Sequence, residues 1–293
     1  MSDRPAVVVT LDGTLHDPSV PLLYADDLAA VRGDGIFETM LVRDGGPCLL
    51  DAHLGRLSHS ARLVDLPAPD PARWRRAVAV AVDAWVGAGN EDGVLRLVYS
   101  RGRENDSGAT AYATIGPVPA RVAEVRRCGL AALTLSRGLA AHGIDDLPWL
   151  LAGAKTLSYA VNMAALRHAE AHGAGDVIFV STDGLILEGP RSTVVIATVS
   201  DEGRRCLLTP PPWYPILRGT TQQALFEVAR NAGYDCDYQA LTRADLLAAQ
   251  GVWLVSSITL AARVHTLDGV ALPAAADAAD IAALIDAAVL SDR

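Results

Sequence analysis

The chain has 293 residues, of which 51% are apolar and 20% are charged, so it can bury a sizeable core in one large or two modest domains. Its formal net charge of −9 argues against a nucleic-acid-binding or anionic-membrane-binding protein, because either surface would need a basic face. Four widely spaced cysteines without a Cys-x-x-Cys motif predict reduced thiols. No segment resembles a signal peptide or reaches the ~18–20 apolar residues of a membrane-spanning helix. We therefore expect a cytoplasmic protein without a nucleic-acid or membrane partner.

The first 120 residues predict alternating strands and helices. Short apolar runs, separated by turns rich in glycine and aspartate, indicate strands. Apolar residues at helical spacing indicate two amphipathic helices, one with Asp51 as its N-cap and one beginning near Pro71. The expected strands are 5–11, 36–42, 48–50, 94–100 and 111–115, and the expected helices are 51–63 and 70–87.

The rest of the chain predicts a second group of strands with fewer helices. A polar, glycine-containing loop at 138–148 precedes a segment that carries the lysine described next. The expected strands are 130–135, 176–181, 185–187, 194–198, 252–257 and 263–267. The expected helices are 159–172, 220–232 and an alanine-rich helix near the C-terminus.

Lys155 is the single lysine of the chain, and the other 24 of its 25 Lys and Arg residues are arginine. Arginine stays protonated, whereas a desolvated lysine can lose its proton and act as a nucleophile or a Schiff-base amine. The residues around Lys155 are small or apolar, which is unusual for an exposed charge. One lysine could remain by chance in an arginine-biased composition, but these surroundings favour a chemical role.

Gly219, Thr220 and Thr221 open a predicted helix and indicate an anion-binding site. Backbone N–H groups, two hydroxyls and the positive end of the helix dipole would meet a phosphate there. The sequence leaves this interpretation open against an ordinary threonine N-cap. His168 and His172 are four residues apart, but the glutamate of a His-Glu-x-x-His site and a third ligand are missing, so we expect no metal.

The order of these motifs resembles the class IV pyridoxal-phosphate enzymes. The motifs are Gly-Asp-Gly-x-Phe-Glu at 33–38, His-x-x-Arg-Leu at 53–57, Lys155, Glu-Gly at 188–189 and a Gly-x-Thr helix start at 219–221. This family contains branched-chain and D-amino acid aminotransferases and aminodeoxychorismate lyase. The likeness spans about residues 25–270, and residues 155–226 look most similar to aminodeoxychorismate lyase.

The resemblance implies an α+β fold with two domains. Residues 1–120 would form a smaller N-terminal α/β sandwich, and residues 149–293 a larger, β-barrel-like C-terminal domain with flanking helices that carries the lysine. Residues 121–148 would be the interdomain strand and loop. The family also implies a homodimer with the active site near the subunit interface, and a small-molecule amino substrate.

The resemblance implies a role for each matching residue. Lys155 would bind pyridoxal 5'-phosphate as a Schiff base and carry a proton, Glu188 would pair with the pyridine nitrogen, and Arg56 would bind the phosphate. The further cofactor contacts that the family implies are Gly219, Thr220, Thr221 and Ser257.

Two departures from the family pattern leave the group beside the cofactor's 3-hydroxyl open. Branched-chain enzymes have Asn-Tyr four and five residues after the lysine, where this chain has Tyr159 and Ala160. Other relatives place a tyrosine before the glutamate of the hairpin, where this chain has Phe37. Tyr159 is therefore the candidate for the 3-hydroxyl, and Phe37 is a candidate substrate contact.

The same cofactor serves either a lyase or an aminotransferase. The lyase would convert 4-amino-4-deoxychorismate into 4-aminobenzoate and pyruvate, and the aminotransferase would act on D-amino or branched-chain amino acids with a 2-oxo acid acceptor. D-amino acid aminotransferases carry a Pro-Arg-x-His loop that binds the substrate carboxylate. The loop at 100–106 lacks this motif, and its Ser-Arg-Gly start favours the lyase.

Three arginines are candidates for the substrate carboxylate: Arg101, Arg103 and Arg191. The alternative for the two loop arginines is that they are solvated surface charges. A non-catalytic cofactor-binding protein is a third class, which the joint presence of the lysine, the glutamate, the phosphate-binding arginine and the Gly-Thr-Thr motif disfavours.

Overall fold

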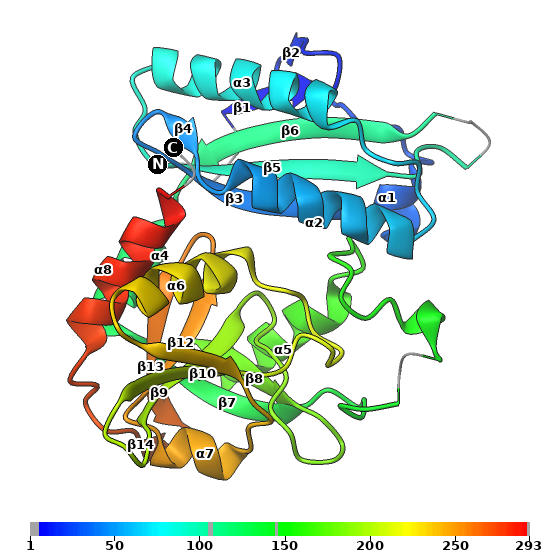
Figure 1. Ribbon diagram of the computed structural model, residues 1–293. Coiled ribbons are helices and arrows are strands. Elements are labelled where there is room, and N and C mark those ends of the chain that lie inside the picture. The colour runs from blue at the N-terminus through cyan, green and yellow to red at the C-terminus, as the bar shows by residue number, and fades with distance from the viewer. Residues whose placement is uncertain (1–5, 105–107, 144–145, 292–293) are drawn as a thin grey trace. The chain divides into compact units, whose positions relative to one another are not determined.

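A computed structural model describes residues 6–104, 108–143 and 146–291 (Figure 1). The chain divides into two compact units. The first unit runs to Pro119 and also takes in Ala154–Tyr159, and the second unit comprises Ala120–Gly153 and Ala160–Ser291. The segment around Lys155 therefore packs with N-terminal residues, although the resemblance placed it in the C-terminal domain.

The first unit is built on an antiparallel sheet whose described strands have the order β2-β1-β6-β5-β3-β4. The long central strands pair over their whole length, from Gly35 opposite Ser100 to Val42 opposite Gly93. The bounds are β1 Val7–Thr10, β2 Leu15–His16, β3 Gly35–Arg43, β4 Gly46–Pro47, β5 Gly93–Ser100 and β6 Thr110–Pro117.

Three helices accompany this sheet: α1 Leu28–Arg32, α2 Leu50–Leu63 and α3 Pro71–Gly87. Asp70 caps α3 by accepting hydrogen bonds from the N–H groups of Ala72 and Arg73, and Pro71 occupies the first turn, as expected. The apolar face of α3 packs on β1 and β6, and α2 packs on β3 (Figure 1). The core between α3 and the sheet includes two large buried side chains, Trp74 and Trp85.

The start of α2 differs from the prediction. Residues 48–50 do not form a strand, because β4 ends at Pro47 and the helix already begins at Leu50. Asp51 is not the N-cap; it lies exposed in the first turn and pairs with Arg75. The N-cap is Leu49, a left-handed residue (φ 53°) without a side-chain capping bond, and its buried apolar side chain offsets that unfavourable conformation.

The second unit has a mixed sheet whose described strands have the order β11-β10-β9-β12-β13-β7-β8, with β14 paired to β13. The β10–β11, β13–β7 and β7–β8 pairs are parallel, and the others are antiparallel. The strand bounds are β7 Leu130–Ser136, β8 Asp176–Val180, β9 Thr193–Val199, β10 Arg205–Thr209, β11 Asp235–Tyr238, β12 Gly251–Ser256, β13 Leu260–Leu267 and β14 Val270–Ala271.

Helices of the second unit pack around this sheet (Figure 1). Helix α6 packs on α8, α4 and α8 pack on β13, and α5 packs on β8. The central strands β9 and β12 are almost wholly buried, which explains their continuous apolar runs. The bounds are α4 Ala120–Cys128, η1 Pro148–Leu150, α5 Ala160–Ala171, α6 Thr220–Asn231, α7 Arg243–Ala248 and α8 Ala278–Val289.

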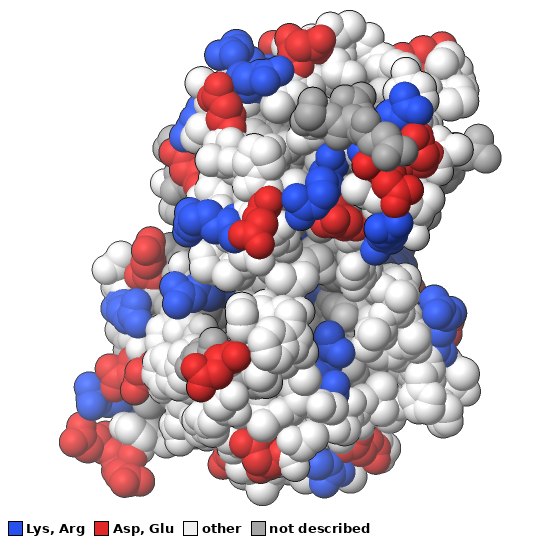
Figure 2. All heavy atoms as spheres, turned by 90° about the vertical axis from the view of Figure 1, so that its right-hand side faces the viewer, with Lys and Arg blue, Asp and Glu red and all other residues white. Residues whose placement is uncertain are grey.

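The expected α+β class with two units is confirmed, whereas one expected strand of the second unit is not formed. Residues 185–187 make only isolated bridges, Val180 to Ile186 and Leu185 to Thr242. Acidic and basic side chains are interspersed over the face drawn in Figure 2. Within the described ranges, no helix combines the length and the apolar character needed to cross a membrane.

Candidate active site

The lysine segment lies beside the start of β3. Backbone hydrogen bonds join Phe37 N–H to the carbonyl of Lys155 (3.0 Å) and Leu157 N–H to the carbonyl of Gly35 (2.8 Å). Strand β4 pairs with β3 only at Val42 and Arg43, so the edge at Gly35–Phe37 is open to this segment. The Nζ atom of Lys155 lies 4.6 Å from the centre of the Phe37 ring, and the side chain is half-buried. An amine against an aromatic face in a partly desolvated place is suited to the chemistry predicted for it.

Two further contacts fix this segment. The hydroxyl of Ser60, buried on α2, accepts a hydrogen bond from Lys155 N–H (3.1 Å). Tyr159 packs edge-to-face on Phe37, with ring centres 5.5 Å apart. The structure thus brings together three residues singled out from the sequence, Lys155, Phe37 and Tyr159.

Arg56 lies in the same unit and is held by a buried carboxylate. Its Nε and Nη2 atoms donate to the two oxygens of Glu38, each at 2.7 Å, and Nδ1 of His53 lies 2.7 Å from Glu38 Oε2. Glu38 is on β3, and His53 and Arg56 are three residues apart on one face of α2. Two parallel hydrogen bonds fix the plane of the guanidinium, whereas a single hydrogen bond would let it rotate.

Charge balance explains how Glu38 tolerates complete burial. Burial alone would raise the pKa of Glu38, but the charge of Arg56 and the hydrogen bonds from Arg56 and His53 outweigh it and hold that pKa well below its ordinary value. Burial lowers the pKa of His53 despite the neighbouring Glu38. A neutral His53 that carries its proton on Nδ1 would donate it to this carboxylate.

The second unit carries the other candidate residues. Glu188 precedes a tight turn in which Gly189 and Ser192 exchange backbone hydrogen bonds, and Leu217 N–H donates to Glu188 Oε2 (2.9 Å). A methyl group on Gly189 would lie 2.2 Å from Ser192 Oγ and 3.1 Å from the carbonyl oxygen of Val177, so the turn favours glycine at this position. The Asn162 side chain donates to the carbonyl of Pro190 (2.7 Å), which ties this turn to α5. The carboxylate of Glu188 is thereby held in one orientation.

The start of α6 has the features of a phosphate site. Its N-cap is Gly219, which provides no side-chain capping bond, and Thr220 and Thr221 are buried. A Cβ on Gly219 would lie 2.3 Å from Thr193 Oγ1, so the Thr193 side chain packs closely against the backbone of this glycine. Thr221 Oγ1 lies 3.4 Å from the hydroxyl of Ser257, which places that predicted residue at the same helix end.

A buried donor at this helix end supports the phosphate interpretation. Gln222 is 3% exposed, and among the described residues its Nε2 has no hydrogen-bond acceptor. Buried polar groups are nearly always paired, so an unpaired amide beside four N-terminal N–H groups indicates a missing acceptor. A phosphate oxygen would supply one, and the residues present therefore fit a phosphorylated cofactor.

The three arginines predicted to bind substrate have different surroundings. Arg101 pairs with Asp34, and Arg103 pairs with Asp26 at 2.9 Å and stacks on Tyr24. Residues 105 and 106 of the same predicted loop lie outside the described residues. The exposed Arg191 of the second unit lies 3.8 Å from Asp176, whose pKa is raised by burial in spite of that charge. Their roles toward substrate stay predictions.

Three site residues were not predicted from the sequence. Glu38 and His53 lie inside the quoted motifs. That both contact or surround Arg56 becomes visible only when the face of β3 with Glu38 is seen packed on the face of α2 with His53 and Arg56. Gln222 had a usable signal, because it occupies the third position of a helix whose cap is a glycine. For the described residues, no cluster of side chains suited to a metal ion is present.

Comparison with known proteins places this site in a family. Residues 35–267 match the family described as amino-transferase class IV. This stretch covers most of the chain and contains Lys155, Arg56, Glu188 and the start of α6. The chain belongs to the class IV aminotransferase family.

Three relatives are similar over nearly their whole length. A Mycobacterium tuberculosis protein named bifunctional aminodeoxychorismate lyase / D-amino acid transaminase is 68% identical over 98% of this chain and 100% of its own length. A hypothetical aminotransferase from Mycobacterium tuberculosis, solved in a PLP-bound form and in a form with α-ketoglutarate and PMP, is 68% identical with a TM-score of 0.95 over 98% and 100% of the two chains. A fold IV transaminase from Curtobacterium pusillum is 38% identical, with a TM-score of 0.91 over 98% and 99%.

Proposed function

We propose that this protein is a pyridoxal-phosphate-dependent enzyme that converts 4-amino-4-deoxychorismate into 4-aminobenzoate and pyruvate. The observation that carries the proposal is the 68% identity, over the full length of the relative, to a protein named for that lyase activity. The lone lysine, half-buried against Phe37, gives the activity a physical basis. The same relative is also named for D-amino acid transamination, so transfer of amino groups from D-amino acids to 2-oxo acids is the second candidate function.

The residues predicted to hold the cofactor have separate roles. From the first unit, Lys155 would bind it covalently and Arg56 would contact its phosphate. From the second unit, Glu188 would hold the proton of the pyridine nitrogen, and the α6 start would cradle the phosphate with Gly219–Thr221 and Ser257. Bound pyridoxal 5'-phosphate supplies an electrophilic carbon for the substrate amine and a ring that accepts electrons from the reacting carbon.

The residues of this chain would supply binding, orientation and proton transfer. Lys155 can take up and release a proton, because a desolvated amine exchanges between its charged and neutral forms. Arginine does not do this. The carboxylate of Glu188, oriented by Leu217 N–H, would hold a proton on the pyridine nitrogen of the bound cofactor. Phe37 would limit water beside the amine and contact the substrate, and Tyr159 is proposed to reach the 3-hydroxyl of the cofactor.

The substrate carboxylate needs a cation. Arg103 and Arg191 are proposed for this role, and the sequence of the loop at 100–106 also makes Arg101 a candidate. Each already has one acidic partner in the same unit, so a substrate carboxylate would have to share or displace it. We further propose a cytoplasmic homodimer, as in the family; a mass twice that of the single chain in light scattering would support the dimer, and a single-chain mass would refute it.

The decisive experiment follows both activities in one preparation. The cofactor-loaded protein is given 4-amino-4-deoxychorismate, with pyruvate and 4-aminobenzoate measured, and separately D-alanine with 2-oxoglutarate. Lys155→Ala removes the amine. Lys155→Arg keeps the positive charge, but the guanidinium does not give up its proton. Both variants should lose about a hundred- to ten-thousandfold in rate if proton transfer is the role.

Each outcome has a defined meaning. Pyruvate and 4-aminobenzoate from the wild type would support the lyase proposal. Amino-group exchange without these products would reject the lyase and leave the aminotransferase. Activity retained in Lys155→Arg would show that the charge alone matters and would refute the proposed proton transfer.

A further inference from the structure

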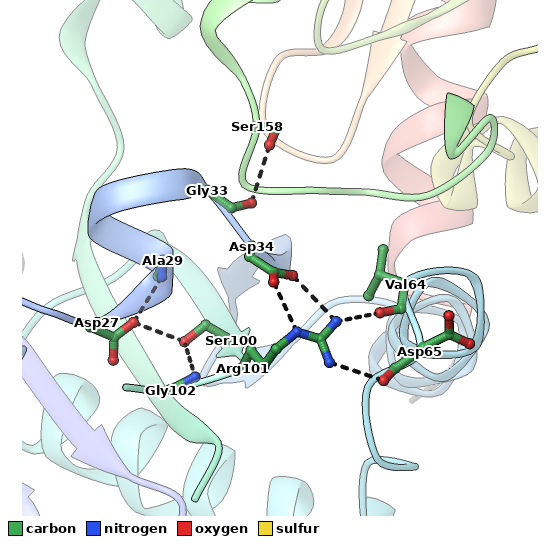
Figure 3. Close-up of polar contacts among 10 residues, drawn as sticks. All are labelled: Asp27, Ala29, Gly33, Asp34, Val64, Asp65, Ser100, Arg101, Gly102 and Ser158. Atoms are coloured by element: carbon green, nitrogen blue, oxygen red, sulfur yellow. Dashed lines mark hydrogen bonds and ion pairs between the residues drawn. The ribbon is translucent and has the colours of Figure 1, made fainter. Parts of the chain in front are cut away.

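Arg101 joins two separate segments of the first unit. Its Nε donates to Asp34 Oδ2 (2.8 Å), its Nη2 donates to the carbonyl of Val64 (2.6 Å), and its Nη1 donates to the carbonyl of Asp65 (3.2 Å). The backbone N–H of Arg101 also donates to the carbonyl of Asp34 (3.2 Å). Figure 3 shows the guanidinium between Asp34 and the two carbonyls that follow α2. The planar fork of arginine is suited to such a bridge, since its donors point in fixed directions.

Both joined segments hold the lysine segment in place. On one side, the carbonyl of Gly35 binds Leu157 N–H, and the carbonyl of Gly33 accepts a bond from the Ser158 hydroxyl (3.2 Å). On the other side, Ser60 of α2 binds Lys155 N–H, one turn before the carbonyls that Arg101 contacts. Arg101 therefore links the two supports between which Lys155 is held, without touching the lysine itself.

The turn that contains Asp34 leaves no room for side chains at the two glycines that flank it. A Cβ on Gly33 would lie 3.0 Å from Ser158 Oγ, and a Cβ on Gly35 would lie 2.8 Å from the Cα of Ser100. Two glycines flank Asp34, so the turn has a high conformational entropy when unfolded and little intrinsic preference for this shape. An external anchor on Asp34 selects the shape in which both carbonyls face the lysine segment.

The loop that carries Arg101 is itself fixed. The Ser100 hydroxyl donates to Asp27 Oδ1 (3.1 Å) and accepts from Gly102 N–H (3.3 Å), and Asp27 Oδ1 also accepts from Ala29 N–H (2.9 Å; Figure 3). Gly102 has φ +83°, and a Cβ there would overlap the carbonyl oxygen of Gly108 at 1.9 Å. The guanidinium thus extends from a rigid base.

We propose that the ion pair of Arg101 with Asp34 positions Lys155. In this proposal Arg101 supports the lysine segment and does not bind the substrate carboxylate. The inference rests on the proposed function of Lys155. Its specific content is that loss of the pair loosens residues 155–158 and changes the environment of the amine, while the rest of the first unit stays folded.

The test uses amide hydrogen exchange on the full-length protein, with and without cofactor. The variants are Arg101→Gln, Asp34→Asn and the double variant. The matched control is Arg43→Gln, which breaks a pair with Asp92 in the same unit (3.3 Å) that does not contact the lysine segment. We expect the amides of Phe37, Lys155 and Leu157 to exchange about tenfold faster in each single variant, because a hydrogen bond to a charged group is lost.

The double variant should show no further increase, because both substitutions remove the same interaction. The control should leave these three amides unchanged. The second readout is the pH midpoint of the visible absorbance of the cofactor bound to Lys155, which should shift in Arg101→Gln and Asp34→Asn alike. Asp34→Asn is nearly isosteric and keeps the test decisive if Arg101→Gln folds poorly.

The results separate failure of this inference from failure of the proposed function. Unchanged exchange and an unchanged midpoint, together with a raised KM for the amino substrate in Arg101→Gln alone, would overturn the inference and assign Arg101 to the substrate carboxylate. Cofactor that binds equally well to Lys155→Ala would refute the function of the lysine, while hydrogen exchange would still report on the ion pair.

Discussion

At the residue scale, Glu38 links the predicted phosphate-binding arginine to the protein interior. A buried carboxylate is costly unless it is paired and fully hydrogen-bonded. Glu38 meets this condition through Arg56 and His53, and the three side chains act as one network. The charges of this network affect both the stability of the protein and the dependence of that stability on pH.

Glu38→Gln should destabilise the protein strongly, because it leaves the nearly buried guanidinium of Arg56 without its counter-charge. Breaking a buried ion pair from one side typically costs about 3–5 kcal/mol in the free energy of unfolding. Chemical denaturation of both proteins, monitored by fluorescence, would measure the loss. Asp51→Asn is the control on the same helix, since it breaks the exposed pair with Arg75, and we expect a much smaller effect. Equal losses in the two variants would contradict the argument.

His53 should make stability depend on pH. Its pKa is lowered in the fold by burial, so as the pH falls below about 6.5 the unfolded chain takes up a proton before the folded protein does. Stability is therefore lost as the pH falls from about 6.5, by up to about 1.4 kcal/mol per pH unit for one proton. The depressed pKa of Glu38 adds a loss only below about pH 4.3.

The measurement is the unfolding free energy of the wild type and of His53→Asn between pH 7.5 and 5. Asparagine can still donate to Glu38 but does not titrate, so the variant should show a flatter profile whatever its absolute stability. The other histidines are the same in both proteins and cancel in the comparison. Parallel profiles would show that His53 does not titrate differently in the fold.

At the element scale, the start of α6 and the segment beside β3 depend on glycines that have neighbouring atoms where a side chain would be. Gly219 faces Thr193 Oγ1, and a methyl group there would push the first turn of α6 away from its position. Because the proposed phosphate donors are backbone N–H groups of that turn, their placement depends on this one contact.

Gly219→Ala should weaken cofactor binding by about tenfold or more, since misplaced N–H groups lose charge-assisted hydrogen bonds. Cofactor titration followed by absorbance or by equilibrium dialysis would give the apparent Kd. Gly87→Ala is the matched control: the position ends α3, and a Cβ there meets nothing within 4 Å. An unchanged Kd in Gly219→Ala would place the phosphate elsewhere.

Elements with local signals could be predicted from the sequence. Strand β3 alternates, and α3 has an N-cap, a first-turn proline and helical spacing, so its bounds matched the prediction closely. Helix α7 was missed although Thr242 and Asp245 form a capping box that the sequence displays. The start of α2 could not be foreseen, because Leu49 caps it by backbone conformation and packing rather than by a side chain.

The candidate site shows the same limit. Motifs predict which residues carry the chemistry, but the partners of Arg56 and Lys155 depend on long-range contacts. Phe37 and Lys155 are 118 positions apart in the sequence, and their hydrogen bond exists only because the lysine segment adds to the open edge of β3. Sequence spacing carries no information about such a contact.

At the scale of the whole molecule, the residues proposed to bind the cofactor lie in segments that are far apart in the sequence, from Arg56 to Ser257. A ligand that binds the folded protein stabilises every part that contributes contacts, by about 2.7 kcal/mol at a hundredfold excess over Kd. The distribution of that stabilisation therefore reports which parts bind the ligand, independently of catalysis.

Pyridoxal 5'-phosphate should slow amide hydrogen exchange in both units, at Phe37 and Leu157 in the first and at Leu217 and the start of α6 in the second. Leu217 is informative because its N–H is the donor to Glu188. Inorganic phosphate should protect the α6 start but not Phe37 and Leu157, since it lacks the ring and the carbonyl group. Lys155→Ala should keep the protection in the second unit but lose part of it beside β3. Protection confined to one unit would refute the proposal that both sets of residues hold the same cofactor.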